Sequence, residues 1–240
     1  GEMNLAEYIE QLTQFGLTRQ EATIYLCLYQ NGELTGYEVA KQTGISRSNV
    51  YSSLAILVEK GAAYLLEGAS SKYMAVTLRE FCENKIRNLQ KLSEELEKNL
   101  PDMRTPSEGY ITIEGYRHIL DKVFHMIEDA EYRVYLSAPK SFVEKIEEAL
   151  SALMKRGRKL VLITDGVSAL TKEGAISYLT QTKAGQLRLI IDSTYVLTGE
   201  ITESESDTCL YCGQPNFVNV FKEALHNEIQ LIELTGGEKQ

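Results

Sequence analysis

Apolar and polar residues alternate with the period of an α-helix along the first part of the chain. This pattern predicts helices over residues 5–12 and 19–30, and a third helix that begins after Thr35 and stops at Gly44. Glu38 follows Thr35 by three residues, which is the spacing of a capping box. The first three helices are therefore short and have clear local start or stop signals.

A fourth helix is predicted between Ser46 and Gly61. Its apolar residues repeat at i, i+4, i+7 and i+8 and share one side: Val50, Leu54, Leu57 and Val58. Two short apolar runs, residues 62–68 and 69–76, then surround a Gly-Ala-Ser-Ser turn and predict a β-hairpin. Two helices joined by a tight turn and followed by a hairpin predict a winged helix-turn-helix domain over residues 3–76.

Residues 77–100 return to helical periodicity and end at Pro101. A helix of this length spans roughly 36 Å, which is longer than a small domain needs. Its apolar seam predicts a two-stranded coiled coil that pairs two copies of the chain, and the alternative is a long helix lying along its own domain. The predicted dimerisation residues are Leu78, Cys82, Leu89, Leu92 and Leu96.

The remainder of the chain alternates strands and helices. Residues 101–109 contain two prolines and a glycine and are interpreted as a linker to a domain over residues 110–236. The predicted strands are 110–113, 132–137, 159–164, 187–191, 195–199, 208–212 and 229–234, and the predicted helices are 116–129, 140–156, 175–179 and 216–227. Strands rich in Val, Leu and Ile between helices indicate an α/β domain whose helices cover the sheet.

Charge changes the interpretation of the first domain. The 240 residues carry a formal net charge of −9, which argues against a protein that coats nucleic acid or an anionic membrane with its whole surface. Residues 35–79, however, carry two more cationic than anionic side chains. No run approaches 18 apolar residues and no secretory signal is recognised, so we expect a cytoplasmic protein without a membrane partner.

The fourth helix has the side chains of a DNA recognition helix. Polar residues of its first turns oppose the apolar side, and Arg47 suits a guanine or a phosphate while Asn49 suits an adenine, a choice that the sequence leaves open. The hairpin tip would act as the wing. The predicted DNA contacts are Thr35, Tyr37, Ser46, Arg47, Ser48, Asn49, Tyr51, Ser52, Ser70, Ser71 and Lys72. Winged helices also bind proteins, so an interaction or sensor module without DNA is the alternative.

Two segments carry a family resemblance: LTGYEVAKQTGISRSNVYSSLAILVEKGAAY at residues 34–64 and ITIEGYRHILDKVFHMIEDAEYRVYLSAP at residues 111–139. They resemble TrmB-type transcriptional regulators. The resemblance implies a multidomain α+β chain with a winged helix, a coiled-coil helix and a domain related to the phospholipase D fold. It also implies a dimeric DNA-binding regulator whose second domain senses a metabolite. Larger members add a sugar-binding module, which we expect to be absent from this short form.

The phospholipase D relation raises a third option, a hydrolase. Such enzymes need a His two residues before a Lys, because the imidazole attacks phosphorus while the ammonium neutralises the phosphoryl oxygens. Two residues after His118, His125 and His226 stand Leu120, Ile127 and Glu228, so we expect no enzymatic activity. A cavity at the strand ends would instead bind a small-molecule effector. The candidate effector residues are Ser137, Lys140, Asp165 and Asp192, although the two aspartates also fit the simpler role of turn caps.

Cys209 and Cys212 form a single C-x-x-C motif. A zinc site needs four ligands, and Cys27 and Cys82 stand far away in sequence. Residues three apart on a strand also point to opposite faces, so plain packing is expected. The sequence thus predicts a homodimeric transcriptional regulator without metal or cofactor, whose partners are a pseudo-palindromic double-stranded DNA operator and an unidentified small-molecule effector.

Overall fold

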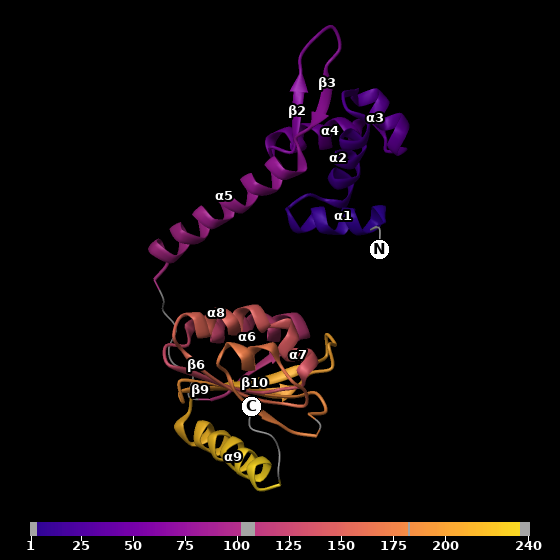
Figure 1. Ribbon diagram of the computed structural model, residues 1–240. Helices are drawn as coiled ribbons and strands as arrows, with labels where there is room; N and C mark the ends of the chain where they lie inside the picture. Colours follow the sequence, from indigo (N-terminus) through magenta and orange to yellow (C-terminus); the bar gives the residue numbers. More distant parts are fainter. Residues whose placement is uncertain (1–3, 102–108, 182, 236–240) are drawn as a thin grey trace. The chain divides into compact units, whose positions relative to one another are not determined.

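The computed structural model describes residues 4–101, 109–181 and 183–235 (Figure 1). The chain divides near residue 103 into two compact units, each with its own core. The predicted linker, residues 101–109, lies almost entirely outside the described residues. The two units are therefore described separately.

The N-terminal unit is a helical domain with a small sheet. Its elements are α1 (Leu5–Gln14), α2 (Arg19–Asn31), β1 (Leu34–Thr35), α3 (Gly36–Thr43), α4 (Arg47–Glu59), β2 (Ala63–Leu66), β3 (Lys72–Ala75) and α5 (Leu78–Asn99). The strands pair antiparallel in the order β1-β3-β2, and β2 and β3 form the predicted hairpin. The sequence prediction of four helices, a hairpin and a long helix is confirmed.

Local capping begins the first three helices. Capping boxes join Asn4 to Glu7, Thr18 to Glu21 and Thr35 to Glu38. The backbone N–H of Thr35 donates to Glu38 and lowers the pKa of that carboxyl group. Helix α2 packs against α3 and α4 to form the core. Burial of each Leu or Ile side chain there contributes about 1.5–3 kcal/mol to the stability of the folded state.

Only the first part of α5 packs on the N-terminal domain. Phe81 is buried in the core and Cys82 lies half-buried beside it, whereas every residue from Ile86 to Leu100 is exposed. Leu89, Leu92 and Leu96 each expose more than half of their surface. Cys82 was predicted to lie on the dimerisation seam, and the structure places it against its own domain because Phe81 draws this helical turn into the core.

A seven-stranded mixed sheet forms the C-terminal unit. Its strands are β4 (Ile111–Glu114), β5 (Arg133–Ser137), β6 (Lys159–Thr164), β7 (Ile176–Leu179), β8 (Gln186–Ile191), β9 (Tyr195–Glu200) and β10 (Thr208–Cys212). The strand order is β4-β10-β9-β8-β5-β6-β7. Strands β5, β6 and β7 are parallel, and the other pairs are antiparallel. The predicted α/β architecture is confirmed, with an antiparallel half added to the parallel one.

Helices cover both faces of this sheet. Figure 1 shows α6 (Tyr116–Asp129), α7 (Lys140–Lys145) and α8 (Glu147–Lys155) on one side and α9 (Pro215–Leu234) on the other. Alternate strand residues serve the two cores: Val134 and Leu136 pack beneath α6 and α8, and Tyr135 packs toward α9. No helix of the described residues is long and apolar enough to cross a membrane.

Two predicted elements of this domain are wrong. Residues 175–179 were expected to be helical, but β7 occupies residues 176–179 and a 3-10 helix precedes it at Ala169–Glu173. Residues 229–234 were expected to form a strand but continue α9, because Val218, Leu225 and Ile232 recur every seven residues and are buried against the sheet. Periodicity in such short apolar runs does not separate strand from helix.

The predicted helix over residues 140–156 is interrupted. The backbone leaves helical geometry at Ile146 (φ −114°, ψ 11°), which divides it into α7 and α8. Ile146 is fully buried, with Val143 on one side of the break and Leu150 on the other. The bend thus lets both short helices keep an apolar side on one core.

The two cysteines of β10 are packing residues. Cys209 and Cys212 are each at most 2% exposed, and burial raises the pKa of the Cys209 thiol to about 12. A thiol with such a pKa is almost wholly protonated at neutral pH and reacts slowly.

We therefore expect iodoacetamide to modify these two cysteines in urea but not in native buffer at pH 7.5, as measured by mass spectrometry of peptides. Rapid native labelling of Cys209 would contradict this packing.

Candidate nucleic-acid interface and effector site

Helix α4 has one buried and one exposed side. Val50, Leu54 and Leu57 are fully buried in the N-terminal core. The other side exposes the predicted contact residues Arg47, Ser48, Asn49, Tyr51 and Ser52. Polar side chains at the exposed N-terminal end of a helix suit the reading of base edges in the major groove.

Arg47 is held in place by an aromatic ring. Its guanidinium carbon lies 4.5 Å from the centroid of the Tyr37 ring, which is about half exposed on α3. A cation over a ring face is attracted by the π-electrons while its N–H groups stay free at the edge. The structure thus brings together two predicted contact residues from different helices and positions the five donors of Arg47 in advance.

The N-terminus of α4 differs from those of the first three helices. Ser46 precedes α4 as predicted but makes no side-chain capping bond, and its Oγ lies 3.4 Å from Oγ of Ser48. The first N–H groups of a helix have no partner within the helix, so they are suited to phosphate oxygens. The hydroxyl of Thr35, by contrast, is bonded to Glu38 and serves to position α3.

A close contact sets the spacing between α3 and α4. The Tyr51 ring lies against Gly36, where an added Cβ would approach ring carbon Cε1 to 2.5 Å. A side chain at residue 36 would require the Tyr51 ring to move. The Tyr51 ring is therefore packed against Gly36, while about half of the residue's surface is exposed on the predicted DNA-binding side.

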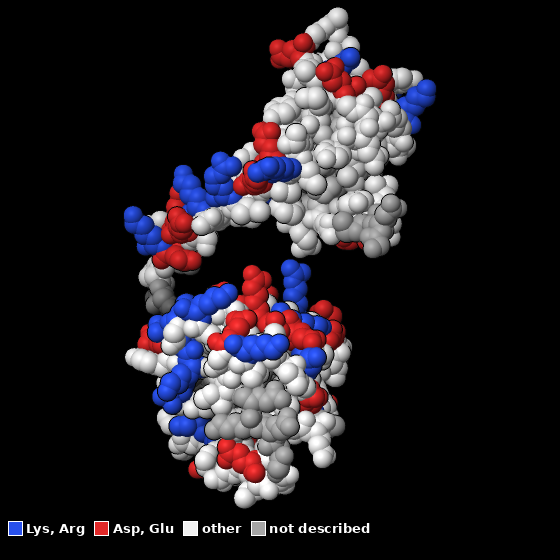
Figure 2. Space-filling view, viewed as in Figure 1, with Lys and Arg blue, Asp and Glu red and all other residues white. Residues whose placement is uncertain are grey.

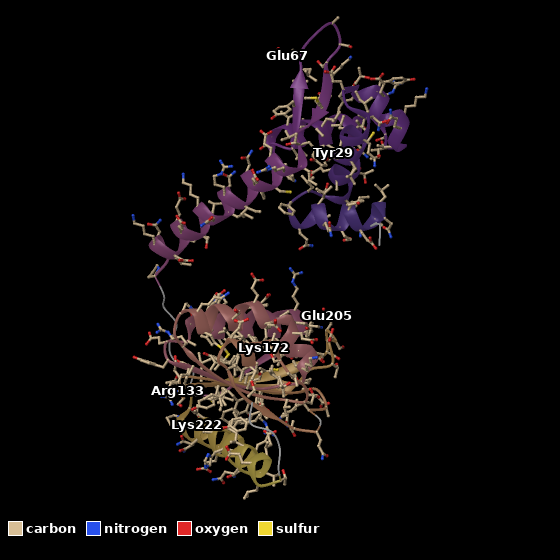
Figure 3. All side chains as sticks on the ribbon, viewed as in Figure 1. Tyr29, Glu67, Arg133, Lys172, Glu205 and Lys222 are labelled. Atoms are coloured by element: carbon tan, nitrogen blue, oxygen red, sulfur yellow. The ribbon has the colours of Figure 1, made fainter. Side chains whose placement is uncertain are left out.

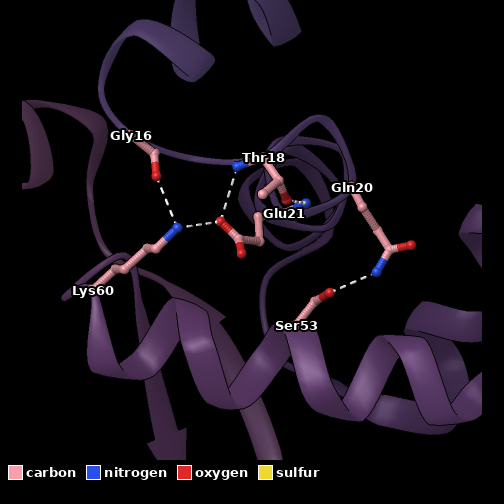
Figure 4. Close-up of polar contacts among 6 residues, drawn as sticks. All are labelled: Gly16, Thr18, Gln20, Glu21, Ser53 and Lys60. Atoms are coloured by element: carbon pink, nitrogen blue, oxygen red, sulfur yellow. Dashed lines mark hydrogen bonds and ion pairs between the residues drawn. The ribbon is translucent and has the colours of Figure 1, made fainter.

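Partly buried polar contacts join α4 and Lys60 to α2 and the turn before it (Figure 4). The Lys60 ammonium after α4 donates to the Gly16 carbonyl at 2.8 Å and to Glu21 Oε2 at 2.6 Å, and Glu21 is only 4% exposed. In the middle of α4, the buried Ser53 hydroxyl accepts from Gln20 at 2.8 Å. The partners stand 33 to 44 residues apart, so no sequence pattern indicated them.

The hairpin forms a wing with little cationic charge. Ser70 and Ser71 lie exposed at its tip, and Glu67 is at the same end (Figure 3). Lys72 was predicted at the tip but begins β3, where its ammonium lies 3.7 Å from Glu33. Charged side chains are sparse over the centre of the visible face of this domain and gather along α5 (Figure 2).

Three predicted effector residues lie together at the carboxyl ends of β5 and β6. Asp165 accepts from the backbone N–H groups of Lys140 at 2.8 Å and Lys183 at 3.2 Å, so it caps two loops. The Lys140 ammonium pairs with Glu144 at 3.3 Å. The Ser137 hydroxyl is fully buried and has no hydrogen-bond partner.

The fourth predicted effector residue, Asp192, lies at the other end of β5. Its carboxylate accepts from the backbone N–H groups of Glu131, Tyr132 and Arg133, each at 2.8 Å. Burial alone raises its pKa, but the three donors lower the pKa of Asp192 below its usual value. Asp192 therefore has the turn-capping role, apart from Ser137, Lys140 and Asp165.

The histidines do not form a catalytic group. His118 and His125 are exposed on α6, whereas His226 is exposed on α9 beyond the opposite face of the sheet. Within the described residues, no group of three His, Cys, Asp or Glu side chains has metal-binding geometry.

Both domains match one family of regulators. Residues 12–79 match the family described as the sugar-specific transcriptional regulator TrmB, and residues 109–227 match the N-terminal EBD subdomain of the transcriptional regulator TrmB. The chain therefore belongs to the TrmB family of transcriptional regulators. This confirms the resemblance drawn from residues 34–64 and 111–139.

Known proteins give the following similarities. The HTH-type sugar sensing transcriptional regulator TrmBL1 of Pyrococcus furiosus is 27% identical over 169 residues, which are 68% of this chain and 48% of TrmBL1. The matched segment covers roughly half of the length of such curated relatives. Among solved structures, the archaeal chromatin protein TrmBL2 is 22% identical over 98% of this chain and 99% of its own, with a TM-score of 0.45. The phospholipase D family member NUC of Salmonella typhimurium is 17% identical over 55% of this chain and 99% of its own, with a TM-score of 0.44.

Replacing Lys60 tests the anchoring of α4. Lys60→Met would leave the buried Glu21 carboxylate with a single backbone donor, which we expect to lower the free energy of unfolding by about 1–3 kcal/mol. The measurement is urea-induced loss of helical circular dichroism. Lys91→Met removes an exposed pair with Glu95 and should change stability by less than about 0.5 kcal/mol. Equal stability of the two variants would contradict an anchoring role for Lys60.

Proposed function

We propose that this protein is a homodimeric transcriptional regulator that binds a pseudo-palindromic operator in double-stranded DNA. Helix α4 enters the major groove, the wing formed by β2 and β3 contacts the backbone, and the C-terminal domain binds a small-molecule effector. The observation that carries the proposal is the exposed polar side of α4, with Arg47 held against Tyr37 and the opposite side locked into the core.

Weak local charge makes base contacts and dimer geometry important. Residues 35–79 carry only two excess positive charges, and Lys72 is already near Glu33. Few phosphate contacts give weak non-specific affinity, since that affinity comes from the release of counterions by cationic side chains. Bidentate contacts by Arg47 and Asn49 would add about 1–3 kcal/mol each and would supply sequence preference.

The exposed seam of α5 supports pairing of two chains. Ile86, Leu89, Leu92, Leu96 and Leu100 are apolar and exposed over several turns. Leaving such a stripe in water is unfavourable, and a second copy of the same helix would bury it as a coiled coil. Two winged helices fixed by one seam would then meet half-sites about one DNA turn apart. An effector controls such a dimer only if it binds one arrangement of the two DNA-binding domains more tightly than another.

Removing the two base-reading side chains tests the DNA interface. Arg47→Ala together with Asn49→Ala should raise the Kd for an operator fragment at least about tenfold, because a bidentate contact is worth about 1–3 kcal/mol. Fluorescence anisotropy at several salt concentrations is the measurement, with the operator selected from random duplexes by the wild-type protein.

A matched control keeps that result interpretable. Arg117→Ala with Asn219→Ala removes the same residue types from exposed positions of the second domain and should leave the Kd within about twofold. If the wild-type chain binds every duplex weakly and without steep salt dependence, the winged helix is a protein-interaction module instead.

Charged substitutions on the seam test the dimer. Leu89→Asp with Leu96→Asp should yield monomers in size-exclusion chromatography with light scattering, because four carboxylates would face one another in each pair of helices. Gln90→Asp with Lys91→Gln makes the same change of two charge units beside the seam and should stay dimeric. A dimer that persists in the leucine variant would move the interface away from α5.

A further inference from the structure

A groove lies between α5 and the rest of the N-terminal domain, at the point where the helix leaves that domain. Its volume is about 480 Å³. The rings of Phe15 and Phe81 line it with their centroids 6.3 Å apart. Leu89 and Leu92 line it as well, and both belong to the exposed seam of α5. One apolar surface therefore continues from the groove onto the seam.

The groove also holds a cation without a counter-ion. Lys85 is half-buried there, and its ammonium makes no ion pair within the described residues. Lys60 pairs with Glu21, whereas Arg87 donates to the neutral amide of Asn84 at 2.7 Å. Lys85 and Arg87 thus remain against a single lining carboxylate, that of Glu59. The groove is apolar at its centre and carries a net positive charge, which suits an acidic segment with apolar anchors.

The far end of α5 is such a segment. Residues 93–100, SEELEKNL, contain three glutamates and one lysine, and their two leucines lie on the seam. Leu96 is 61% exposed and Leu100 is 70% exposed. Figure 1 shows this end of α5 extending away from α1 to α4. It can therefore enter the groove of a second copy without meeting its own DNA-binding domain.

Lys85 distinguishes the two directions in which α5 could pair. It lies on the seam by helical spacing, three residues after Cys82 and four before Leu89. In a parallel coiled coil each seam residue faces the same residue of its mate, so two Lys85 ammonium groups would meet and repel. In an antiparallel pair, Lys85 faces the glutamate-rich end of the partner helix instead.

We propose that two copies of the chain pair through antiparallel α5 helices, so that the end of each helix fills the groove of the other copy. In the register that we propose, Lys85 lies opposite the partner's Leu96, Leu89 opposite the partner's Leu92, and Phe81 opposite the partner's Leu100. Two-fold symmetry makes each contact occur twice. This inference rests on the proposed pairing of two chains through α5.

This register satisfies both halves of the groove. Leu96 and Leu100 of the partner would cover the apolar lining and lose their exposure to water. The Lys85 stem would run along Leu96 while its ammonium reaches Glu95 or Glu97 of the partner, the two acids beside that leucine. The two Phe81 residues would be about 29 Å apart along the coiled coil, close to one turn of DNA, whereas a parallel pair brings them to about 8–10 Å.

Disulfide cross-linking of the full chain tests the direction. Lys85→Cys together with Leu96→Cys, in a Cys82→Ala background, should give a covalent dimer after mild oxidation. Mass spectrometry of tryptic peptides should show residues 80–87 joined to residues 92–98. Positions 85 and 96 are about 16 Å apart on one helix, so such a disulfide forms only between chains.

The single variants are the matched controls. Lys85→Cys alone and Leu96→Cys alone each leave their two cysteines about 16 Å apart along an antiparallel pair, but directly opposite in a parallel one. We expect each single variant to give less than about a tenth of the covalent dimer that the double variant gives. Efficient self-cross-linking of either single variant overturns the antiparallel arrangement.

A charge exchange tests the role of Lys85. Lys85→Glu should raise the Kd of the dimer at least about tenfold in sedimentation equilibrium, and Glu95→Lys with Glu97→Lys on the same chain should restore it to within about threefold. Residues ten or more apart on one helix do not touch, so recovery arises between chains. In a parallel dimer, Lys85→Glu only exchanges one like-charged pair for another. Failure of the two lysines to restore the dimer overturns the pairing of Lys85 with the acidic end.

Two further variants keep this result interpretable. Lys91→Glu makes the same charge change on the side of α5 away from the seam and should alter the Kd less than about threefold. If Lys85→Glu loses its native circular dichroism, Lys85→Gln takes its place. A weaker dimer of Lys85→Gln supports the proposal, whereas a tighter one overturns it, because a parallel pair would be relieved of its repulsion.

The outcomes separate the orientation from the pairing itself. A dimer that cross-links through single cysteines at 85 or 96 retains the pairing through α5 and overturns only the antiparallel direction. A chain that stays monomeric, or a dimer in which no variant cross-links, overturns both. Operator binding by anisotropy is measured on the same preparations and tests the DNA interface independently of either result.

Discussion

The arrangement of the winged helix depends on the packing of α4 against α2. Val50, Leu54 and Leu57 bury one side of α4, and the Glu21–Lys60 pair fixes its C-terminal end. Apolar packing alone leaves a helix able to slide or rotate slightly, whereas an ion pair to a buried carboxylate is favourable in one register only. The exposed side of α4 therefore keeps one orientation relative to the domain, and the Tyr37 ring on α3 contacts the Arg47 guanidinium beside it. A helix that reads bases in a DNA groove has to hold its side chains in fixed positions.

The C-terminal domain shows the opposite use of buried polar groups. Apolar side chains form its two cores, yet the Lys183–Glu228 pair and Ser137 place polar atoms between sheet and helix. Glu228 Oε2 and the Ser137 hydroxyl have no hydrogen-bond partner among the described residues. Buried polar atoms without partners lower the stability of the domain.

Much of the fold could be predicted from the sequence because its signals are local. The Thr35–Glu38 box and Gly44 delimit α3, and the apolar spacing from Val50 to Leu57 identifies the buried side of α4. Prediction failed where a short run is compatible with two structures. Residues 229–234 form a short run rich in Ile and Leu that fits a strand or a helix, and burial of Ile232 against the sheet accompanies the helical form. Cys82 fits the leucine seam by spacing, but Phe81 next to it is buried and turns Cys82 toward the domain.

The sequence by itself determined the order of the elements, the exposed polar row of α4, the leucine seam and the family, since each rests on residues close together in the chain. Only the tertiary structure decided which groups act together. Gly36 meets Tyr51, Lys60 meets Glu21, and Lys183 meets Glu228 across separations of 15, 39 and 45 residues. Such contacts depend on how sheets and helices pack, and periodicity shows which side of an element is buried but not which distant residue it meets. Asp165 and Asp192 likewise follow strand ends in the same way, yet the fold puts them at opposite ends of one sheet.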